Sequence, residues 1–249
     1  PGRRSTRWRP RNGRWGRRGG SVRRYGFHGI AHAGMYERYR QFTQRSLTPE
    51  RVVSLHLGHG CSAAALLDGL PVETSMGYTP LEGLIMGTRP GDIDAGIVLE
   101  LLREGAPASE IDTSLSRNSG LLGLSGETAD MRELLDLEAR GAARAKLALN
   151  AFCHRVVKYV GAYAAVLGGI DALLFGGGIG ENAAAIRARI CNKLAWLGIE
   201  LDSAANERCS GREGAITTPT SRVEVYALAV HEERTIARSV CEHFKWEET

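Results

Sequence analysis

The stretch RVVSLHLGHGCSAAALLDGLPVETSMGYTPLEGLIMGTRPGDIDAG, residues 51–96, decides the fold. It opens with Val52 to Leu57, a β-branched run with partial period-2 alternation, which predicts a strand with one buried face. Gly58-His59-Gly60 follows as a sharp turn, and residues 63–67 predict a returning strand closed by the Asp68-Gly69 turn signal. We therefore expect a hairpin whose tip has free N–H groups and small side chains, a geometry suited to phosphate.

The second half of this stretch is too polar and too rich in glycine to form a core. Residues 74–94 place carboxylates, threonines and one arginine among glycines, a composition typical of a site. Arg89 can present planar, permanently charged donors to phosphoryl oxygens or to a carboxylate substrate. The alternative for this residue is an ion pair with Asp92 or Asp94, which are close in sequence.

A second glycine-rich turn lies further along the chain. Residues 171–175 predict a short buried strand that enters the glycines at 176–180 and then a helix to about Trp196, an arrangement that favours nucleotide or anion binding. A rival interpretation is the loose dinucleotide fingerprint Gly178-x-Gly180-x-x-Ala183, with Glu200 or Asp202 as the ribose-binding acid. That interpretation leaves the segments around His28, His59 and Arg89 unexplained.

Length and composition indicate an ordinary globular protein. The chain has 249 residues, of which 43% are hydrophobic and 24% charged, and no uninterrupted apolar run approaches the ~20 residues that a membrane span needs. The five cysteines are scattered singly, without a CxxC pair. This usage favours reduced thiols in a cytoplasmic protein over a disulfide or zinc framework.

The basic character of the chain is confined to its N-terminal region. Residues 1–24 hold ten arginines and no acid, so the rest has 22 basic against 28 acidic residues. An Arg-rich segment without an apolar h-region is not a secretory signal, although it is compatible with a transit peptide or a nucleic-acid-binding arm. Because the segment has no periodicity, we expect residues 1–22 to be a disordered leader.

Elsewhere the periodicity predicts mainly helices. Residues 142–167 form the longest candidate, a core helix that buries Leu147 and its neighbours at helical spacing and stops at Gly168-Gly169. Within it, Cys153 and His154 are predicted to be packing residues. Further helices are predicted at 35–45, 96–103 and 127–140, followed by a loop at 203–221, a strand at 222–230 and a last helix from His231.

Three long motifs, in the same order, resemble the C-terminal half of the acetate and propionate kinase family. They are HLGHGCS (56–62), SMGYTPLEGLIMGTRPGDID (75–94) and LLFGGGIGEN (173–182). The resemblance covers roughly Val22 to Ser239 and implies an α/β fold of the ribonuclease H-like type, one mixed sheet with helices on both sides. It also implies that residues 23–249 are the second, nucleotide-binding domain of a two-domain kinase, with only the end of the first domain present.

The resemblance further implies transfer of the γ-phosphoryl group of ATP to acetate or a similar short carboxylate, giving acetyl phosphate and ADP, with Mg²⁺ neutralising charge. It assigns His28 and Arg89 to catalysis and Glu232 to the metal, for which a carboxylate supplies the hard oxygen that Mg²⁺ prefers. It implies a cytoplasmic homodimer without a membrane partner. Its nucleotide-binding positions are His56, Leu57, Gly58, His59, Gly60, Asp130, Met131, Arg132, Gly178, Ile179, Gly180, Glu181 and Asn182.

For several of these residues the sequence leaves a structural alternative. His28 could be a structural histidine, or half of a metal site with His32 at i, i+4. Asp130 and Glu232 could be ordinary acids in the first turn of an exposed helix.

The motifs also depart from the family pattern. His59 and His231 replace asparagine, Pro90 replaces serine, and Ile30-Ala31 replaces a Thr-Ser pair. Because the family's N-terminal phosphate loop has no counterpart in this sequence, we expect impaired activity. The alternative function is a non-catalytic nucleotide-binding remnant with a basic arm that contacts nucleic acid.

Overall fold

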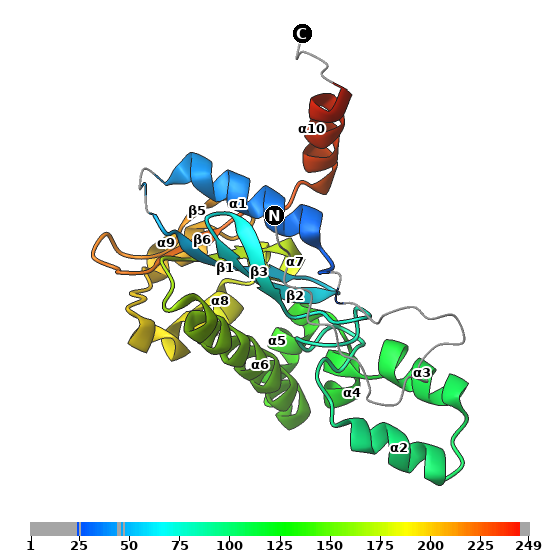
Figure 1. Ribbon diagram of the computed structural model, residues 1–249. Helices are drawn as coiled ribbons and strands as arrows, with labels where there is room; N and C mark the ends of the chain where they lie inside the picture. Colours follow the sequence, from blue (N-terminus) through cyan, green and yellow to red (C-terminus); the bar gives the residue numbers. More distant parts are fainter. Residues whose placement is uncertain (1–23, 25, 44–45, 47, 245–249) are drawn as a thin grey trace.

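The computed structural model describes Arg24, residues 26–43, Ser46 and residues 48–244; the predicted leader lies outside the described residues. Its centre is a mixed sheet in the order β3-β2-β1-β4-β6-β5 (Figure 1). β1 pairs antiparallel with β2 and parallel with β4, and β4 pairs parallel with β6. This is the ribonuclease H-like arrangement that the family resemblance implies. The strands are β1 Arg51–Leu57, β2 Cys61–Leu67, β3 Leu70–Thr74, β4 Ala172–Gly176, β5 Gly214–Ala215 and β6 Glu224–Ala227.

Helices cover both faces of the sheet (Figure 1). The face opposite α1 is covered by α6 and α8, while α2 and α3 form an arm beside the sheet and α10 projects away from it (Figure 1). The helices are α1 Gly29–Phe42, α2 Ala95–Arg103, α3 Ala108–Arg117, α4 Gly120–Ser125, α5 Met131–Ala139, α6 Ala143–Leu167, α7 Gly177–Asn182, α8 Ala184–Lys193, the 3₁₀ turn η1 Ala195–Leu197, α9 Ser203–Arg208 and α10 Glu232–Phe244. In the part of the chain that the structure describes, no helix is long and apolar enough to cross a bilayer.

The central strand β1 is buried on both faces, so the prediction of a single buried face is wrong. Val53 and Leu55 belong to the larger core beneath α6, whereas Val52 belongs to a smaller core beneath α1. Because side chains alternate along a strand, Ser54 and His56 share the α1 face with Val52. The polar positions in the alternation therefore mark a second, polar interface rather than a solvent-exposed face.

The long helix α6 confirms the predicted element, with Gly168 in the left-handed conformation at its C-cap. Val156, Val160 and Tyr163 are buried as expected. Leu147 is 56% exposed, and His154 is also exposed, so the prediction that both pack in the core is wrong. Helical spacing identifies a stripe of residues but does not fix how far round the helix the core extends.

Two other expectations need correction. The single helix predicted to run to about Trp196 is interrupted at Ala183, which separates α7 from α8. The predicted loop at 203–221 contains α9 and the short strand β5, and Asp202 caps α9 by accepting a hydrogen bond from the Ala205 N–H. All five cysteines are free, as their spacing predicts.

A fully buried arginine holds α7, α8 and α9 together. Arg187 on α8 donates to the carbonyls of Gly180 and Glu181 at 2.8 Å, and to Asn206 through its side-chain oxygen at 2.8 Å and its carbonyl at 2.7 Å. The guanidinium thereby satisfies carbonyls at the end of α7, a role that intrahelical bonds cannot fill. Burial lowers the pKa of Arg187, which is the cost of this arrangement.

A buried histidine joins α1 to the sheet. His32 is 5% exposed, and its Nδ1 lies 2.9 Å from Ser54 Oγ while its Nε2 lies 2.8 Å from Ser62 Oγ. Burial, together with the neighbouring His56 and His28, lowers the pKa of His32 to about 3. Since both ring nitrogens are occupied by serines, the alternative of a metal site with His28 is not supported.

Replacing the buried arginine, in Arg187→Met, should lower the free energy of unfolding by about 3–5 kcal/mol, because several buried acceptors lose a charged donor at once. Chemical denaturation measures this loss. The matched control is Arg208→Met, which removes an exposed arginine of α9 and should change stability by no more than about 0.5 kcal/mol. Equal effects of the two substitutions would contradict the structural role.

Stability should fall on acidification between pH 6.5 and about 3, because over this range the unfolded chain binds a proton at His32 and the folded chain does not. His32 changes the free energy of unfolding by at most about 1.4 kcal/mol per pH unit. Above pH 6.5 its contribution to stability is fully present. Denaturation of His32→Gln from pH 4 to 7.5 should give a shallower slope than the parent chain. His154→Gln, at an exposed position, should leave the slope unchanged; an unaltered slope in His32→Gln would refute the assignment.

Candidate functional site

Two glycine turns meet at the carboxyl ends of neighbouring parallel strands. β1 runs into Gly58 and β4 runs into Gly177, and a Cβ built on Gly58 would lie 3.8 Å from the Gly178 N. Gly177 has a φ of 76°, and a Cβ there would lie 2.7 Å from the Leu57 carbonyl oxygen. Only glycine allows this approach, which places backbone N–H groups at the edge of the sheet where α/β proteins bind ligands.

The loop at residues 75–94, which carries Arg89 and is called the arginine loop below, closes over the same point. A Cβ built on Gly60 would lie 2.8 Å from Nη2 of Arg89 and 3.4 Å from Cε1 of His28. The tip of the hairpin, the arginine and the histidine therefore converge, although they are far apart in sequence. Arg89 donates through Nη1 to the Pro80 carbonyl at 2.8 Å, which leaves Nη2 directed at the glycine.

The alternative partners of Arg89 are engaged elsewhere. Asp92 accepts from the Gly83 N–H at 2.9 Å and pairs with Arg155 at 3.4 Å, and Asp94 caps α2. No ion pair joins either carboxylate to Arg89 among the described residues. The guanidinium is therefore available to an anion.

The start of α4 fixes the backbone of the arginine loop, a role that the sequence did not reveal. The N–H groups of Leu121 and Leu122 donate to the carbonyls of Met86 and Gly87 at 2.9 Å. Gly120, with a φ of 61°, sits against the loop so closely that a Cβ would lie 2.3 Å from the Met86 oxygen. In the sequence, only the glycines around 120–126 indicate this contact. A glycine does not show which segment it packs against.

Backbone contacts also tie the loop to the hairpin tip. The Gly87 N–H donates to the His59 carbonyl at 2.9 Å, and the Gly58 N–H donates to the Gly60 carbonyl at 3.1 Å. The exposed imidazole of His59 packs beside Gly87, where a Cβ would lie 2.7 Å from its Nδ1. The hairpin tip and the arginine loop thus form one rigid rim.

The imidazoles of His28, His32 and His56 lie together behind this rim. His28 is the N-cap of α1 in the left-handed conformation, and its ring centroid lies 4.6 Å from that of His56. Burial lowers the pKa of His56 to about 4, and burial also lowers that of His28, where Arg89 acts in the same direction and Glu232 opposes it. The Nδ1 of His56 is buried without a hydrogen-bond partner among the described residues.

The proposed acid for the metal lies in the first turn of α10. Glu232 is exposed and close enough to act on the His28 pKa. Mg²⁺ carried by a nucleotide keeps most of its waters and takes few protein carboxylates, so a single acid fits this role. In the described part of the chain no group of three His, Cys, Asp or Glu side chains could hold a metal ion by itself.

Other side chains predicted to bind nucleotide form hydrogen bonds within their own segments. Asp130 caps α5 and pairs with the exposed Arg132 at 2.8 Å, the geometry of the structural alternative. Asn182 Nδ2 donates to the Gly178 carbonyl at 2.9 Å, which closes α7 on itself. The acids of the dinucleotide alternative are engaged elsewhere: Asp202 caps α9, and Glu200 accepts from two threonines.

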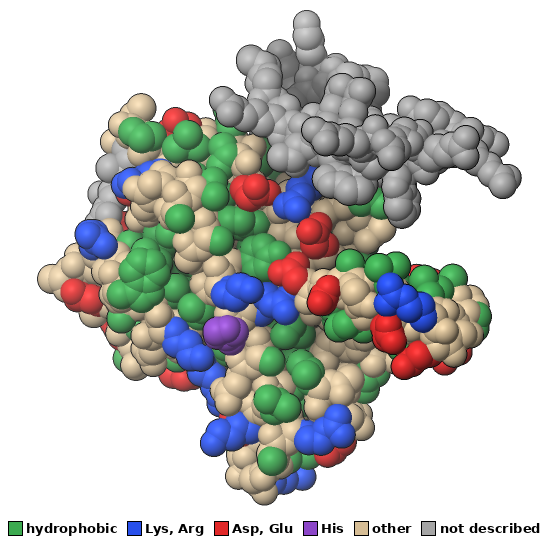
Figure 2. All heavy atoms as spheres, turned by 60° about the horizontal axis from the view of Figure 1, so that its bottom comes forward, with side chains coloured by type: hydrophobic (Ala, Val, Ile, Leu, Met, Phe, Trp, Pro, Cys, Tyr) green, Lys and Arg blue, Asp and Glu red, His purple; other side chains and the backbone are tan. Residues whose placement is uncertain are grey.

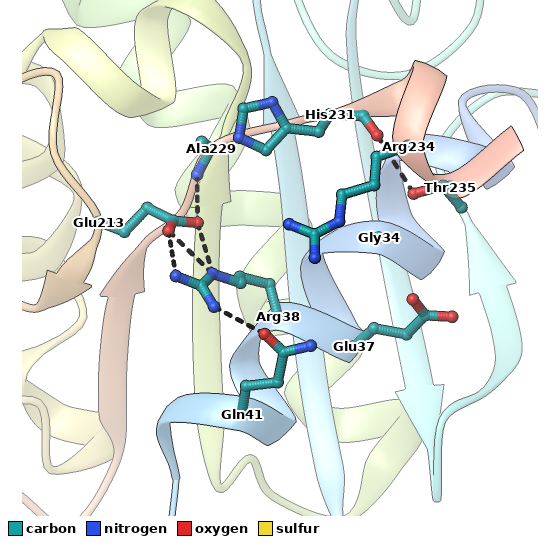
Figure 3. A pocket seen from close by; sticks show the side chains of 9 residues that line it. All are labelled: Gly34, Glu37, Arg38, Gln41, Glu213, Ala229, His231, Arg234 and Thr235. Carbon is teal, nitrogen blue, oxygen red and sulfur yellow. Dashed lines mark hydrogen bonds and ion pairs between the residues drawn. The ribbon is translucent and has the colours of Figure 1, made fainter. Parts of the chain in front are cut away.

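A separate hollow of about 90 Å³ lies between α1 and α10 (Figure 3). Its principal ion pair is Arg38 with Glu213, whose carboxylate also accepts from the Ala229 N–H at 3.2 Å. The lining charges largely neutralise one another, so this hollow is not a candidate anion site. On the face shown in Figure 2, basic side chains gather around a histidine near the middle, with acidic and hydrophobic side chains beside them.

Known proteins are similar to this chain in both sequence and structure. The acetokinase family model matches residues 14–238. An acetate kinase of Solibacter usitatus is 47% identical over 219 residues, covering 87% of this chain and 53% of that protein. An acetate kinase of Helicobacter hepaticus is 48% identical over 219 residues, covering 87% of this chain and 54% of that protein.

Among solved structures, the acetate kinase of Porphyromonas gingivalis matches this chain with 41% sequence identity and a TM-score of 0.85. The match covers 89% of this chain and 56% of the Porphyromonas gingivalis chain. A propionate kinase of Francisella tularensis is 42% identical, with a TM-score of 0.79, and covers 87% of this chain and 55% of that one. The chain spans about half the length of the curated relatives it matches. With a family model matched along most of its length and a rim of glycines, arginine and histidine in place, the chain belongs to the acetokinase family.

Proposed function

We propose that this chain carries the ATP-binding wall of a phosphotransferase that moves the γ-phosphoryl group of ATP to acetate or a similar short carboxylate, giving acetyl phosphate and ADP. The observation that carries the proposal is the convergence of Arg89 and His28 on Gly60, beside the contact of Gly58 with Gly178. Two side-chain donors and two glycine backbones facing one point form an anion site built for several phosphoryl oxygens.

In this function the chain supplies electrostatics and position. Phosphoryl transfer spreads negative charge over the equatorial oxygens of the transferring group, and preorganised donors stabilise that charge without further rearrangement. Arg89 supplies a permanent charge through Nη2, and His28 supplies a directional donor. Residues 56–60 and 178–182 hold the phosphates and nucleoside, residues 130–132 lie toward the adenosine, and Glu232 holds the Mg²⁺ that neutralises the phosphates.

The donors of this chain come from one side of the site. Arg89 and the glycine backbones belong to the rim at the end of β1 and β4, and His28 lies directly behind it. An acyl acceptor must approach in line from the opposite side, and fixing that approach accounts for much of the rate acceleration in group transfer. We therefore assign nucleotide binding to this wall and include in the proposal that turnover needs a second wall.

The proposal includes the cytoplasmic homodimer. Helix α2 supports it, because Ile97, Leu99 and Leu102 are 45–52% exposed and none of the residues of α2 is buried. An amphipathic helix that buries nothing within its own chain is suited to contact a second copy.

Removing the arginine of the rim, in Arg89→Ala, should weaken ATP binding about 10- to 100-fold, because a charged hydrogen bond to a phosphate contributes about 1.5–3 kcal/mol. Isothermal titration calorimetry with Mg-ATP, in the absence of acetate, measures the change. Arg103→Ala removes the same charge from an exposed position on α2 and should leave the affinity unchanged. Equal affinities for all three proteins would place the phosphates elsewhere.

The 249-residue chain alone, supplied with acetate, Mg-ATP and hydroxylamine, should form no detectable acetyl hydroxamate, because in-line positioning from one wall is incomplete. Binding of ATP that depends on Arg89 should persist in the same preparation. Robust hydroxamate formation that Arg89→Ala abolishes would show that this wall suffices and would contradict the expectation. Absence of both turnover and ATP binding would count against the proposed function.

A further inference from the structure

A relay of hydrogen bonds leads from the sheet core to His28. Ser54 Oγ lies 2.9 Å from Nδ1 of His32, and Ser62 Oγ lies 2.8 Å from Nε2 of the same ring. The Ser62 oxygen also lies 2.9 Å from Nδ1 of His28. A hydroxyl has one proton to donate and a neutral imidazole has one, so fixing the proton at one end of the relay fixes the direction of every bond in it.

The buried end of the relay sets this direction. Ser54 is fully buried, and its hydroxyl has two neighbours: His32 Nδ1 at 2.9 Å and the Met35 sulfur at 4.0 Å. A thioether is a weak acceptor, and a buried O–H without a good acceptor is costly, so the Ser54 proton goes to Nδ1 of His32.

The remaining protons follow from the first. His32 is neutral, because burial lowers its pKa to about 3. With its Nδ1 accepting, His32 carries its single proton on Nε2 and donates to the Ser62 oxygen. The Ser62 hydroxyl proton then has one acceptor left in the relay, which is Nδ1 of His28.

We propose that Ser54, His32 and Ser62 are positioning residues that hold His28 in a single tautomer, with a lone pair on Nδ1 and the proton on Nε2. The tautomer rests on the relay alone, whereas its use in phosphoryl binding rests on the proposed function.

The groups around His28 agree with a neutral ring. Ser62 faces it from β2, His56 from β1, Arg89 from the arginine loop and Glu232 from α10. Burial of His28 and the charge of Arg89 disfavour the imidazolium, and Glu232 only partly offsets them, so the pKa of His28 lies below its ordinary value.

This tautomer makes the site chemically consistent. The Nε2 of His28 and the Nη2 of Arg89 would lie 3.5 Å and 2.8 Å from a Cβ built on Gly60, so both face the same space. With the proton on Nε2, both groups are donors and suit one anion. The opposite tautomer would present a lone pair to the phosphoryl oxygens and repel them. The relay thus gives a donor that works without the histidine becoming charged.

Two-bond ¹H–¹⁵N correlation spectra of the full chain, labelled with ¹⁵N-histidine, test the tautomer at pH 7.5. His28→Gln and His32→Gln assign the signals. We expect an unprotonated, acceptor-type Nδ1 and a protonated Nε2 in both rings. A protonated Nδ1 in either ring would reverse the relay and overturn the proposal.

Substitution of the central serine tests whether the relay imposes the tautomer. In Ser62→Ala, the two nitrogens of His28 should shift toward each other as the ring samples both tautomers, and Ser62→Thr should restore the separation. Ser75→Ala, which removes another buried hydroxyl of the same region, should leave His28 unchanged. An identical His28 spectrum in Ser62→Ala would show that Ser62 does not set the tautomer.

Titration with Mg-ATP, in the absence of acetate, separates this proposal from the proposed function. If ATP perturbs the Nε2–H signal of His28, the tautomer and its use are both supported. If the tautomers are as expected and saturating ATP leaves that signal unmoved, the relay stands and the role of His28 in phosphoryl binding falls.

Discussion

The site depends on a close backbone approach that only glycine permits. Leu57 ends the central strand with its carbonyl 2.7 Å from where a Cβ of Gly177 would lie, and Gly60 leaves the space that the Arg89 guanidinium occupies. A side chain at Gly177 would push the two turns apart, and one at Gly60 would displace the Arg89 guanidinium. Because β1 and β4 are parallel neighbours, their carboxyl ends already lie at one edge of the sheet, and the glycines bring the turns into contact there.

Around this contact the structure uses rigid backbone rather than mobile side chains. The arginine loop is bonded on one side to the hairpin tip through Gly87 and His59, and on the other to the start of α4. Arg155 of α6 donates to the Gly83 carbonyl at 2.8 Å and anchors the loop to the long core helix. Donors fixed in this way need little reorganisation when charge develops on a bound group, which is the condition for electrostatic catalysis.

The sequence predicted those parts of this arrangement that are local. Alternation, turn glycines and a C-capping glycine place β1, β2, β4 and α6 correctly, because each signal lies within the segment that it describes. The support of the arginine loop by Gly120 could not be predicted, since it joins segments that are distant along the chain and leaves only a glycine as its sign. The burial of β1 on both faces was missed for a related reason: Ser54 looks like a solvent-facing position until its partner His32 is known.

The departures from the family pattern fall where a backbone-made site tolerates them. His59 contributes its carbonyl to the rim, and every residue type has that carbonyl, so a change of side chain leaves the bond to Gly87 available. Pro90 lacks an N–H, but the loop bonds on either side use the Met86 and Asp92 N–H groups instead. Ala31 is buried without needing a hydroxyl, while the adjacent Ile30 is 45% exposed.

Positions whose side chains act, by contrast, are tied to partners: Arg89 to the Pro80 carbonyl, and His28 to Ser62 and the buried relay behind it. Change is therefore expected to be tolerated where the main chain binds and restricted where a proton or a charge must be held in place.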